Sequence, residues 1–413
     1  MKFLIITRDT PANSNVAGHF ARVDGLISYL FSRQHDIHVY YPNRLFGRRK
    51  NSFYGSRPVS SIWSLFDYDY LSSANILTRF LLAPFKLVRR FKRFSIDESE
   101  LYLPSIEKTL RKNAKHNDYD IIIVSAPPHS FLTLINPLRL LYPNSNIIAD
   151  CRDPWTLRPL LYNSNASLKK QEAGLLKKFN SVLVVSSVMR REYAREFDLD
   201  NIYVLENGIS DWIAKYKIPA LKQKNTSEIL FGYFGTGGIN HSSGSGKDLQ
   251  FLCEFFEKYR HFKYRIKLLL RGHIINNSLS IYKQTSIAPS CVEEKLVNAY
   301  DEIDIAVYIY MASEDVSLVM GAKLYEYLSR DKFIWVITNG RPEAIQEFAD
   351  NIGGVHITDI HTTDIESDFD YVLSQYENFS GRHDTLINQY KRDSLIDVFF
   401  KEYMDDNFSH RSF

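Results

Sequence analysis

The strongest constraint on the fold is a repeated order of apolar strand, loop with Gly or Pro, and helix. A strand at residues 2–7 leads through a polar loop at 8–19 into a helix near 19–34. A second strand follows at 36–41. Strands joined through a helix run parallel, and a parallel sheet needs a covering layer on both faces. Loops at the carboxyl ends of its strands meet at one edge, where α/β proteins bind ligands.

The same order recurs in two blocks, and 413 residues exceed the size of one core. Further strands are expected at 119–125, 146–150, 181–185, 202–205, 229–234, 264–270, 303–308 and 333–338. Helices are expected near 104–115, 131–141, 167–179, 187–196, 248–259, 293–300 and 386–406. We therefore predict an α/β protein of two Rossmann-like, doubly wound domains facing each other across a cleft. They are residues 1–208 and 209–385, and the C-terminal helix in 386–413 packs back towards the first.

Composition indicates a globular protein, with 45% hydrophobic and 24% charged residues. Its three cysteines, Cys151, Cys253 and Cys291, are far apart and odd in number, which fits a reducing compartment and predicts neither a disulfide framework nor a paired zinc site. The start of the chain is too short for a signal peptide, and no apolar run approaches the roughly 20 residues of a membrane-spanning helix. We expect a cytoplasmic protein.

Residues 43–105 break the strand–helix order and are rich in aromatic and basic residues. Within them, Ile76–Phe94 carries bases and no acid; the bases are Arg79, Lys86, Arg89, Arg90, Lys92 and Arg93. Such a composition is typical of a helix on an anionic membrane surface. The alternatives are a helix packed on its own domain with a solvated basic face, and nucleic-acid binding. We predict the membrane surface and no nucleic acid.

The segment Met320–Lys332, followed by the apolar run Phe333–Ile337, reads as a helix leading into a buried strand. The helix is entered at Gly321, and free N–H groups and the helix dipole favour phosphate there. Lys323 and Glu326 are three residues apart and share a face. They offer a cation to phosphate and a carboxylate to ribose hydroxyls. The alternative is an ordinary exposed helix face.

Two further features end strands of the same domain and converge on that helix. One is the Gly-rich loop from Gly235 and Thr236 to Lys247, and the other is Arg271. Glycines let the backbone approach phosphate, and the two cations add charge. The loop has neither the Walker A nor the GxGxxG spacing. A flexible surface loop is the alternative, and we favour phosphate binding.

In the first domain, two edge loops carry side chains suited to chemistry. Asp153 follows a strand and precedes a proline, so its carboxylate is fixed and can orient or deprotonate a hydroxyl. Arg152 can pair with Asp153 or with a phosphate, and His129 can act in the same place or be a plain loop residue. No Asp-x-Asp is placed to hold a divalent metal at a diphosphate, and the one at Asp67–Asp69 lies inside the basic aromatic insertion. We therefore expect no metal or other cofactor, and protein cations that neutralise the leaving group.

Four more residues, which follow strands of the first domain, are assigned to the cleft and the acceptor. They are Gly18, His19, Asn207 and Gly208. For Gly18 the alternative is that it only shapes a turn.

Taken together, these motifs resemble bacterial GT-B glycosyltransferases of the family 4 type. The segments that carry the resemblance are Ser125–Ser130, Ala149–Thr156, Glu206–Ile209 and Ala322–Leu328, with the Gly18 loop before them. The resemblance covers nearly the whole chain outside residues 43–105. Many relatives build capsule, O-antigen or other surface polysaccharides on lipid-linked acceptors.

The resemblance implies a GT-B fold with a nucleotide-sugar donor in the second domain, an acceptor in the first, and transfer with retention of configuration. Glu326 then resembles the ribose ligand, and the backbone of Ala322–Leu324 with Lys247 resembles the diphosphate cradle. Arg152 and Asp153 fall near the reacting sugar.

The sequence departs from the family pattern at two places. Leu318 stands where many members have a carboxylate for the donor sugar, and Glu314 or Asp315 are substitutes. The usual short Gly-Arg-to-Lys loop is replaced by a longer stretch from Gly235 to Lys247, which leaves Arg271 as the substitute for the phosphate-binding arginine.

We therefore predict a metal-independent glycosyltransferase of the hexosyltransferase type, acting on a saccharide or lipid-linked saccharide in capsule, lipopolysaccharide or other surface polysaccharide biosynthesis. It would be peripheral at the inner face of the cytoplasmic membrane. The alternatives are a nucleotide-sugar epimerase on the same fold and, because of Leu318, a nucleotide-sugar-binding scaffold without transfer.

Overall fold

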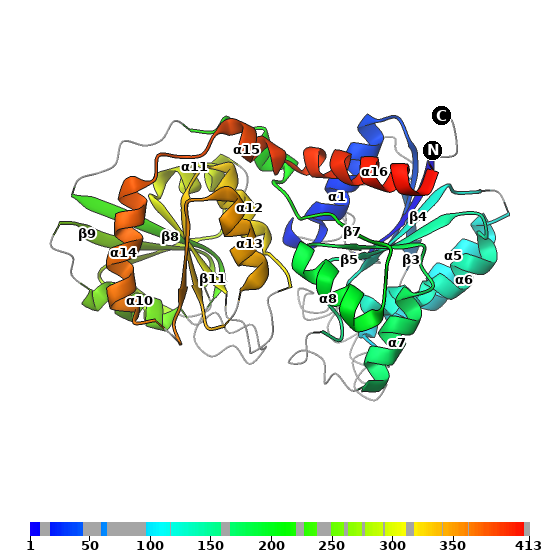
Figure 1. Ribbon diagram of the computed structural model, residues 1–413, viewed down its shortest axis with the longest axis horizontal. Coiled ribbons are helices and arrows are strands. Elements are labelled where there is room, and N and C mark those ends of the chain that lie inside the picture. Colours follow the sequence, from blue (N-terminus) through cyan, green and yellow to red (C-terminus); the bar gives the residue numbers. More distant parts are fainter. Residues whose placement is uncertain are drawn as a thin grey trace, which may run out of the picture. The chain divides into compact units, whose positions relative to one another are not determined.

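The computed structural model describes residues 1–8, 17–43, 59–63, 96–115, 117–157, 166–219, 227–237, 249–259, 263–274, 277–291, 294–310, 318–340, 342–361 and 363–408. They form two compact units (Figure 1). The first consists of the described parts of Met1–Leu157, Ser164–Leu205 and Phe399–Phe413, and the second of those of Glu206–Val398. The last helix therefore begins in the second unit and ends in the first.

The first unit is built on a seven-stranded sheet in the order β3-β2-β1-β4-β5-β6-β7. The strands are β1 (Lys2–Ile6), β2 (Asp36–Asn43), β3 (Val59–Trp63), β4 (Ile121–Ala126), β5 (Asn146–Cys151), β6 (Ser181–Val184) and β7 (Ile202–Val204). Every pairing is parallel. The chain leaves β1 towards β2 and later returns on the other side as β4, so the topological switch lies between β1 and β4.

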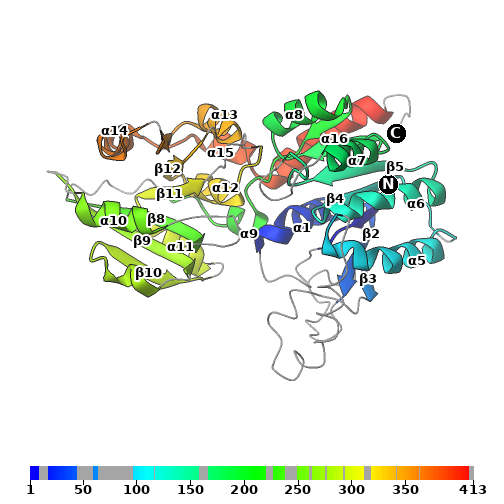
Figure 2. The same ribbon diagram turned by 90° about the horizontal axis from the view of Figure 1, so that it is seen from below.

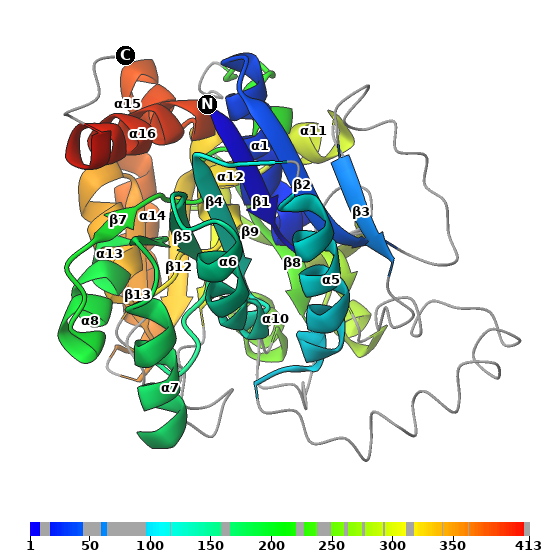
Figure 3. The same cartoon turned by 90° about the vertical axis from the view of Figure 1, so that its right-hand side faces the viewer.

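Helices cover this sheet on both faces. They are α1 (Ala17–Ser32), η1 (Glu98–Tyr102), α5 (Leu103–Asn113), η2 (His129–Leu134), α6 (Ile135–Leu141), α7 (Ala166–Leu176), α8 (Ser187–Phe197) and the end of α16 (Arg392–Phe408). In Figure 3, α5 and α6 lie over the face turned to the viewer. Phe400 of α16 packs edge-on against Phe3 of β1 and is stacked on Tyr29 of α1, which ties the end of the chain to the first unit.

The second unit has a six-stranded parallel sheet in the order β10-β9-β8-β11-β12-β13. Figure 2 shows this order from β10 to β12. The strands are β8 (Glu228–Gly237), β9 (Arg265–Ile274), β10 (Thr285–Pro289), β11 (Ile305–Tyr310), β12 (Phe333–Thr338) and β13 (Val355–Asp359). The chain leaves β8 towards β9 and returns on the other side as β11, which puts the switch between β8 and β11.

The helices of the second unit are α9 (Asp211–Ala214), α10 (Gln250–Lys258), η3 (Asn277–Ile281), α11 (Glu294–Glu302), α12 (Ala322–Ser329), α13 (Glu343–Ile352), α14 (Ile365–Asn378), α15 (Asp384–Gln389) and the start of α16. Figure 1 shows α10 and α14 on one face of the sheet and α12 and α13 on the other. Aromatic rings of α10 and α14 surround Trp335 and Phe231 of the sheet. Full burial of side chains of this size supplies much of the hydrophobic stabilisation.

Several elements differ from the sequence-based expectations. The residues 43–105 that interrupt the strand–helix order contribute β3, which pairs with β2. Helix α1 begins at Ala17, so Gly18 and His19 lie in its first turn and not in a loop. The expected helix 386–406 is two helices, α15 and α16. Strand β10 was not expected because it is an edge strand with mostly exposed side chains, which removes the alternating or fully apolar pattern by which strands are recognised.

A buried ion pair holds the carboxyl edge of the first sheet together. Arg22 of α1 lies 2.8 Å from Asp150 of β5 and also donates to the carbonyl of Leu205. The second carboxylate oxygen of Asp150 accepts from Ser125 of β4 at 3.1 Å. The pair is buried, with exposed side-chain fractions of 6% and 2%, so each charge depends on the other for compensation.

Candidate functional site

The best-defined candidate site lies in the second unit, at the start of α12. This helix follows β11 and begins beside the switch point between β8 and β11, where ligands of doubly wound sheets bind. Gly321 is its N-cap residue and makes no side-chain cap hydrogen bond. The N–H of Leu324 donates to the carbonyl of Gly321 at 3.1 Å, and the preceding N–H groups, of Ala322 and Lys323, are the ones that face an anion at this end of the helix.

Lys323 and Glu326 lie on one face of α12, as their spacing predicted, and form an ion pair there. The ammonium of Lys323 lies 2.6 Å from Oε2 of Glu326. The hydroxyl of Tyr300 of α11 donates to the same carboxylate oxygen and accepts from Lys323 at 2.8 Å. The exposed fractions of the Lys323 and Glu326 side chains are 32% and 11%, so the array is reachable from solvent mainly at Lys323.

Glycine at position 321 leaves room for the side chain of Tyr308. A Cβ at this position would lie 2.4 Å from the hydroxyl oxygen of Tyr308 in β11. Glycine therefore lets α12 begin directly against the end of the strand, and the backbone of Ala322 and Leu324 follows in the first turn.

The ends of β8 and β9 carry two facing glycines. Gly235 pairs with Gly272, and Thr236 with His273. Gly272 has a φ of +146°, and a Cβ there would lie 1.9 Å from the carbonyl oxygen of Gly235. Close backbone approach thus explains this part of the Gly-rich stretch. Lys247, at its far end, lies outside the described residues.

Arg271 ends β9 beside Cys291, which follows β10. Its Nη1 donates to Sγ of Cys291 at 3.3 Å. Its buried Nε has no hydrogen-bond partner within the described part of the chain.

Leu318 is 5% exposed, so the position of the carboxylate found in many family members holds a buried apolar side chain. The proposed substitutes Glu314 and Asp315 lie outside the described residues.

In the first unit, the structure brings His129 together with the turn that carries Arg152 and Asp153. Arg152 donates through its backbone N–H to the carbonyl of Ala126 at 2.8 Å and through Nη2 to that of Pro127 at 2.6 Å. The ring of His129 is stacked on Trp155 at 5.8 Å with an 11° angle between planes. His129 is only 3% exposed, whereas Asp153 is half-buried, so Asp153 is the more accessible of the two.

Glu172 of α7 holds the same turn in place. It was not among the residues predicted from the sequence. It accepts from the backbone N–H of Thr156 at 2.8 Å, from the Thr156 hydroxyl, and from Tyr193 at 3.2 Å. Burial raises the pKa of Glu172, and the hydrogen bonds from Thr156 oppose that shift. An acid within a predicted helix gives no local signal for this contact, which joins residues 16 positions apart.

Asp97 fixes the neighbouring loop in a similar way. Its carboxylate accepts from the backbone N–H of Ser130 at 2.9 Å and from the Ser130 hydroxyl at 2.6 Å. Asp97 also caps η1 through the N–H of Ser99. Two acidic residues that follow no motif thus hold the loops that present His129, Arg152 and Asp153.

Asn207 and Gly208 lie in the second unit and not in the first domain, where we predicted them. Asn207 donates to the carbonyl of Met320 at 3.0 Å, just before α12, and its own carbonyl accepts from Arg392 at 3.0 Å. Gly208 has a φ of +64°, and a Cβ there would lie 2.8 Å from Leu395. Both residues connect the chain after β7 to α12 and α16.

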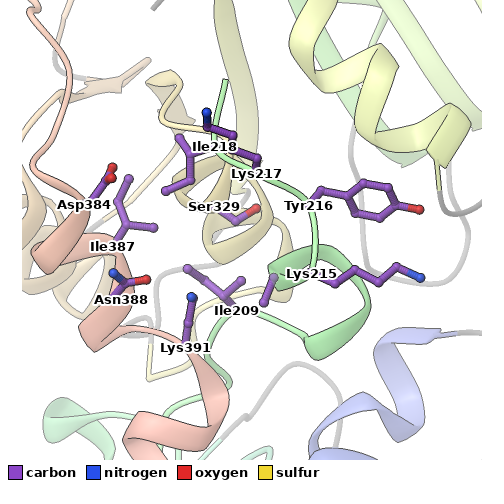
Figure 4. A pocket seen from close by; sticks show the side chains of 11 residues that line it. Ile209, Lys215, Tyr216, Lys217, Ile218, Ser329, Asp384, Ile387, Asn388 and Lys391 are labelled. Carbon is purple, nitrogen blue, oxygen red and sulfur yellow. The ribbon is translucent and has the colours of Figure 1, made fainter. Parts of the chain in front are cut away.

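A pocket of about 300 Å³ lies elsewhere in the second unit. Figure 4 shows Ile209, Ile387 and Lys391 around it, while the side chains of Lys215 and Tyr216 point away. Ser329, at the carboxyl end of α12, also lines it. Because Ser329 lies at the opposite end of this helix from Gly321, the pocket is distinct from the candidate site, and none of the predicted site residues within the described ranges lines it.

The basic residues Arg79, Lys86, Arg89, Arg90, Lys92 and Arg93 lie outside the described residues. Among the helices that the structure does describe, none combines the length and apolar character needed to cross a membrane.

The raised pKa of Glu172 predicts a specific pH dependence of stability. A carboxyl group whose folded-state pKa lies above the unfolded value stabilises the fold fully at low pH, and this contribution is lost as pH rises through the folded pKa. Glu172→Gln cannot ionise, so the free energy of unfolding of this variant should rise relative to that of the wild type as the pH increases above 4.5. Urea unfolding of both proteins at a series of pH values measures the difference.

Glu196→Gln is the control, because a hydrogen bond from Lys169 lowers the pKa of Glu196. The carboxylate of Glu196 therefore contributes to the free energy of unfolding at higher pH, and this contribution is lost as the pH falls through the folded-state pKa of Glu196. A pH-independent difference between the wild type and Glu172→Gln would contradict the assignment.

Comparisons with known proteins identify related sequences and folds. Residues 17–211 match the family model described as Glycosyltransferase Family 4. The search of curated proteins gave no match.

Solved structures resemble the chain over nearly its full length. An α,α-trehalose-phosphate synthase (UDP-forming) from Burkholderia vietnamiensis has 12% identity and a TM-score of 0.60, covering 100% of this chain and 98% of that one. The N-terminal domain of trehalose-6-phosphate phosphatase from Candida albicans has 13% identity and a TM-score of 0.60, with 98% and 97% covered. TarM from S. aureus has 10% identity and a TM-score of 0.55, with 97% and 99% covered.

At these identities the structural likeness concerns the fold, and it confirms the predicted α/β class with two Rossmann-like parallel-sheet units. Residues 17–211 are thus similar to the Glycosyltransferase Family 4 model, and the chain as a whole has the GT-B fold.

Proposed function

We propose that the protein is a glycosyltransferase that moves a sugar from a nucleotide-sugar donor to a saccharide or lipid-linked saccharide acceptor. The observation that carries the proposal is the array that Lys323 and Glu326 in the first turns of α12 form with Tyr300 of α11, next to the sheet's switch point. It supplies a cation, free N–H groups and a carboxylate together, as a nucleoside diphosphate requires.

The known ligands of the structural neighbours support a nucleoside diphosphate. The Burkholderia vietnamiensis synthase is named as UDP-forming, and the TarM structure contains UDP. The catalytic domain of starch synthase IV from Arabidopsis thaliana was solved with ADP and acarbose. Because these neighbours bind different bases, the base for this protein is left to the binding screen below.

In our proposal the second unit holds the donor. The N-terminal N–H groups of α12 and Lys323 contact the diphosphate, and Glu326 accepts hydrogen bonds from ribose hydroxyls. Lys323 is the more exposed member of the ion pair, so its ammonium can reach an additional oxygen without leaving Glu326. Stabilisation of the negative charge that develops on the leaving diphosphate then accounts for most of the rate enhancement.

The first unit holds the acceptor in this proposal. Asp153 orients or deprotonates the acceptor hydroxyl, whose oxygen forms the new bond to the sugar carbon on the face from which the diphosphate leaves, while the bond to the diphosphate breaks. The hydroxyl proton passes to Asp153 or to the departing diphosphate oxygen. Glu172 and Thr156 fix the turn that carries Asp153, and Arg152 is held by the carbonyls of the neighbouring loop. Retention of configuration and independence from metal are part of the proposal.

One observation favours a second candidate, a nucleotide-sugar-binding scaffold without transfer. Leu318 is buried where many family members place a carboxylate against the donor sugar. Tight binding of nucleoside diphosphates without turnover of any nucleotide sugar would support the scaffold, and slow hydrolysis of a donor would support the transferase.

We further propose that the acceptor pathway is surface polysaccharide biosynthesis and that the protein works at the inner face of the cytoplasmic membrane. The support is the composition of Ile76–Phe94, which combines bases and apolar residues without any acid.

Glu326→Gln should weaken nucleoside diphosphate binding by about 10- to 100-fold, because hydrogen bonds to a charged acceptor contribute roughly 1.5–3 kcal/mol. A thermal-shift screen with UDP, ADP and GDP identifies the base, and calorimetry then gives the two dissociation constants. Glu343→Gln, an exposed residue in the first turn of α13, is the control. Equal affinity of wild type and Glu326→Gln would remove this residue from the donor site.

Asp153→Asn should reduce turnover by about 10²- to 10⁴-fold, the usual contribution of an acid–base residue. Affinity for the nucleoside diphosphate should not change, because Asp153 lies in the other unit. Release of nucleoside diphosphate from a panel of nucleotide sugars and acceptors measures turnover. Asp198→Asn, at a site that is 93% exposed, serves as the control. Wild-type turnover in Asp153→Asn would exclude it from the mechanism.

Replacement of Arg89, Arg90, Lys92 and Arg93 by Glu should release the protein from vesicles of anionic phospholipid, since each nearby base contributes about 1 kcal/mol. Vesicle flotation measures the bound fraction. A control variant reverses four exposed bases of the first unit, Lys177, Lys178, Arg195 and Lys401, and makes the same change in net charge. Retained binding of the first variant would favour the alternative of a helix packed on its own domain.

A further inference from the structure

We propose that Tyr300 is a positioning residue that fixes the carboxylate of Glu326 and thereby sets the preference of the site for ribose over deoxyribose nucleotides. This inference rests on the proposed donor site and adds a residue that no sequence motif contains. Tyr300 lies in α11, 26 positions before Glu326.

The contacts around Glu326 are unequal at its two oxygens. Oε2 accepts from the Tyr300 hydroxyl and from the ammonium of Lys323, the latter at 2.6 Å. Lys323 also donates to the Tyr300 hydroxyl at 2.8 Å and lies 5.5 Å from the centre of its ring. Within the described residues, Oε1 accepts no hydrogen bond, so it is the oxygen left for a ligand.

Tyr300 is held more rigidly than either of its partners. Its side chain has no exposed surface, and its ring centre lies 4.5 Å from that of Phe234 and 5.7 Å from that of Tyr327. Burial raises the pKa of Tyr300 well above its usual value, so its hydroxyl stays protonated and remains a donor at neutral pH. Lys323 is partly exposed and has several rotatable bonds, so it cannot fix the carboxylate alone.

A carboxylate that is fixed at Oε2 presents Oε1 in one direction. A ribose hydroxyl placed there gains a charge-assisted hydrogen bond, and a nucleotide without that hydroxyl leaves a desolvated acceptor unpaired. If Tyr300 loses its hydroxyl, Glu326 keeps Lys323 but can rotate its carboxylate. The site should then discriminate less between ribose and deoxyribose.

Tyr300→Phe tests this inference with UDP, ADP and GDP and their 2′-deoxy and 3′-deoxy analogues. For the base that the wild type binds, we expect a preference of about tenfold or more for ribose over at least one deoxy analogue. In Tyr300→Phe this ratio of dissociation constants should fall to within about threefold of one. A purely structural role would weaken all the nucleotides equally and leave the ratio unchanged.

Tyr325→Phe is a closely matched control. Tyr325 lies in the same helix as Glu326, is equally buried, and donates its hydroxyl to another carboxylate, Glu206, at 2.7 Å. Its hydroxyl bonds Glu206, whereas that of Tyr300 bonds Glu326, so this variant should keep the wild-type ratio. An equal fall of the ratio in both tyrosine variants would overturn the inference.

A double-mutant cycle separates action through Glu326 from independent action. In the Glu326→Gln background, Tyr300→Phe should cause no further change in the ratio. A further fall there, a wild-type ratio in Tyr300→Phe alone, or a wild type that binds ribose and deoxyribose nucleotides equally would each overturn the inference. If the wild type binds no nucleoside diphosphate, the proposed function fails, and this inference fails with it.

Discussion

Parallel pairing of every strand is the constraint on which the rest of this protein depends. In both sheets each pairing is parallel, so all the strand-to-helix loops of a sheet leave from one edge. The second sheet thereby brings the glycines after β8 and β9 to the same edge as the start of α12, and the first sheet brings His129 beside Arg152. Chemistry can then be assembled from residues that are far apart in sequence.

Helix α12 is both the proposed binding element and a structural anchor. Its first turns carry Lys323 and Glu326, while the turn at its other end buries Arg330, whose guanidinium makes two hydrogen bonds to Asp301 at 2.9 and 2.8 Å. Lys332 then donates to the carbonyl of Ile303 at 2.8 Å. The charges of Arg330 and Lys332 are thus compensated within the fold, and these contacts fix the direction of the helix in the absence of a ligand. Donor binding therefore does not have to pay the entropy cost of ordering the helix.

The sequence predicted the relation between site residues that are close together in the chain, and it did not predict contacts between residues that are far apart in the chain. Lys323 and Glu326 are three residues apart on one helix, so helical geometry alone predicted that they share a face. Tyr300, Glu172 and Asp97 reach their partners from other elements and follow no motif, and they were missed. Asn207 and Gly208 ended a strand and were assigned to the first domain, but their contacts to Met320, Arg392 and Leu395 place them in the second unit.

The α/β class, the two units and the helix with its Lys and Glu can be read from local patterns, because strand and helix periodicities and short spacings are local properties. The strand orders, the contribution of β3 and the edge strand β10, and the burial of His129 against Trp155 depend on how distant segments pack. So does the hydrogen bond from Tyr300 to Glu326. These features arise from packing between distant segments, and the free energy of such contacts does not depend on the residues that neighbour them in the chain.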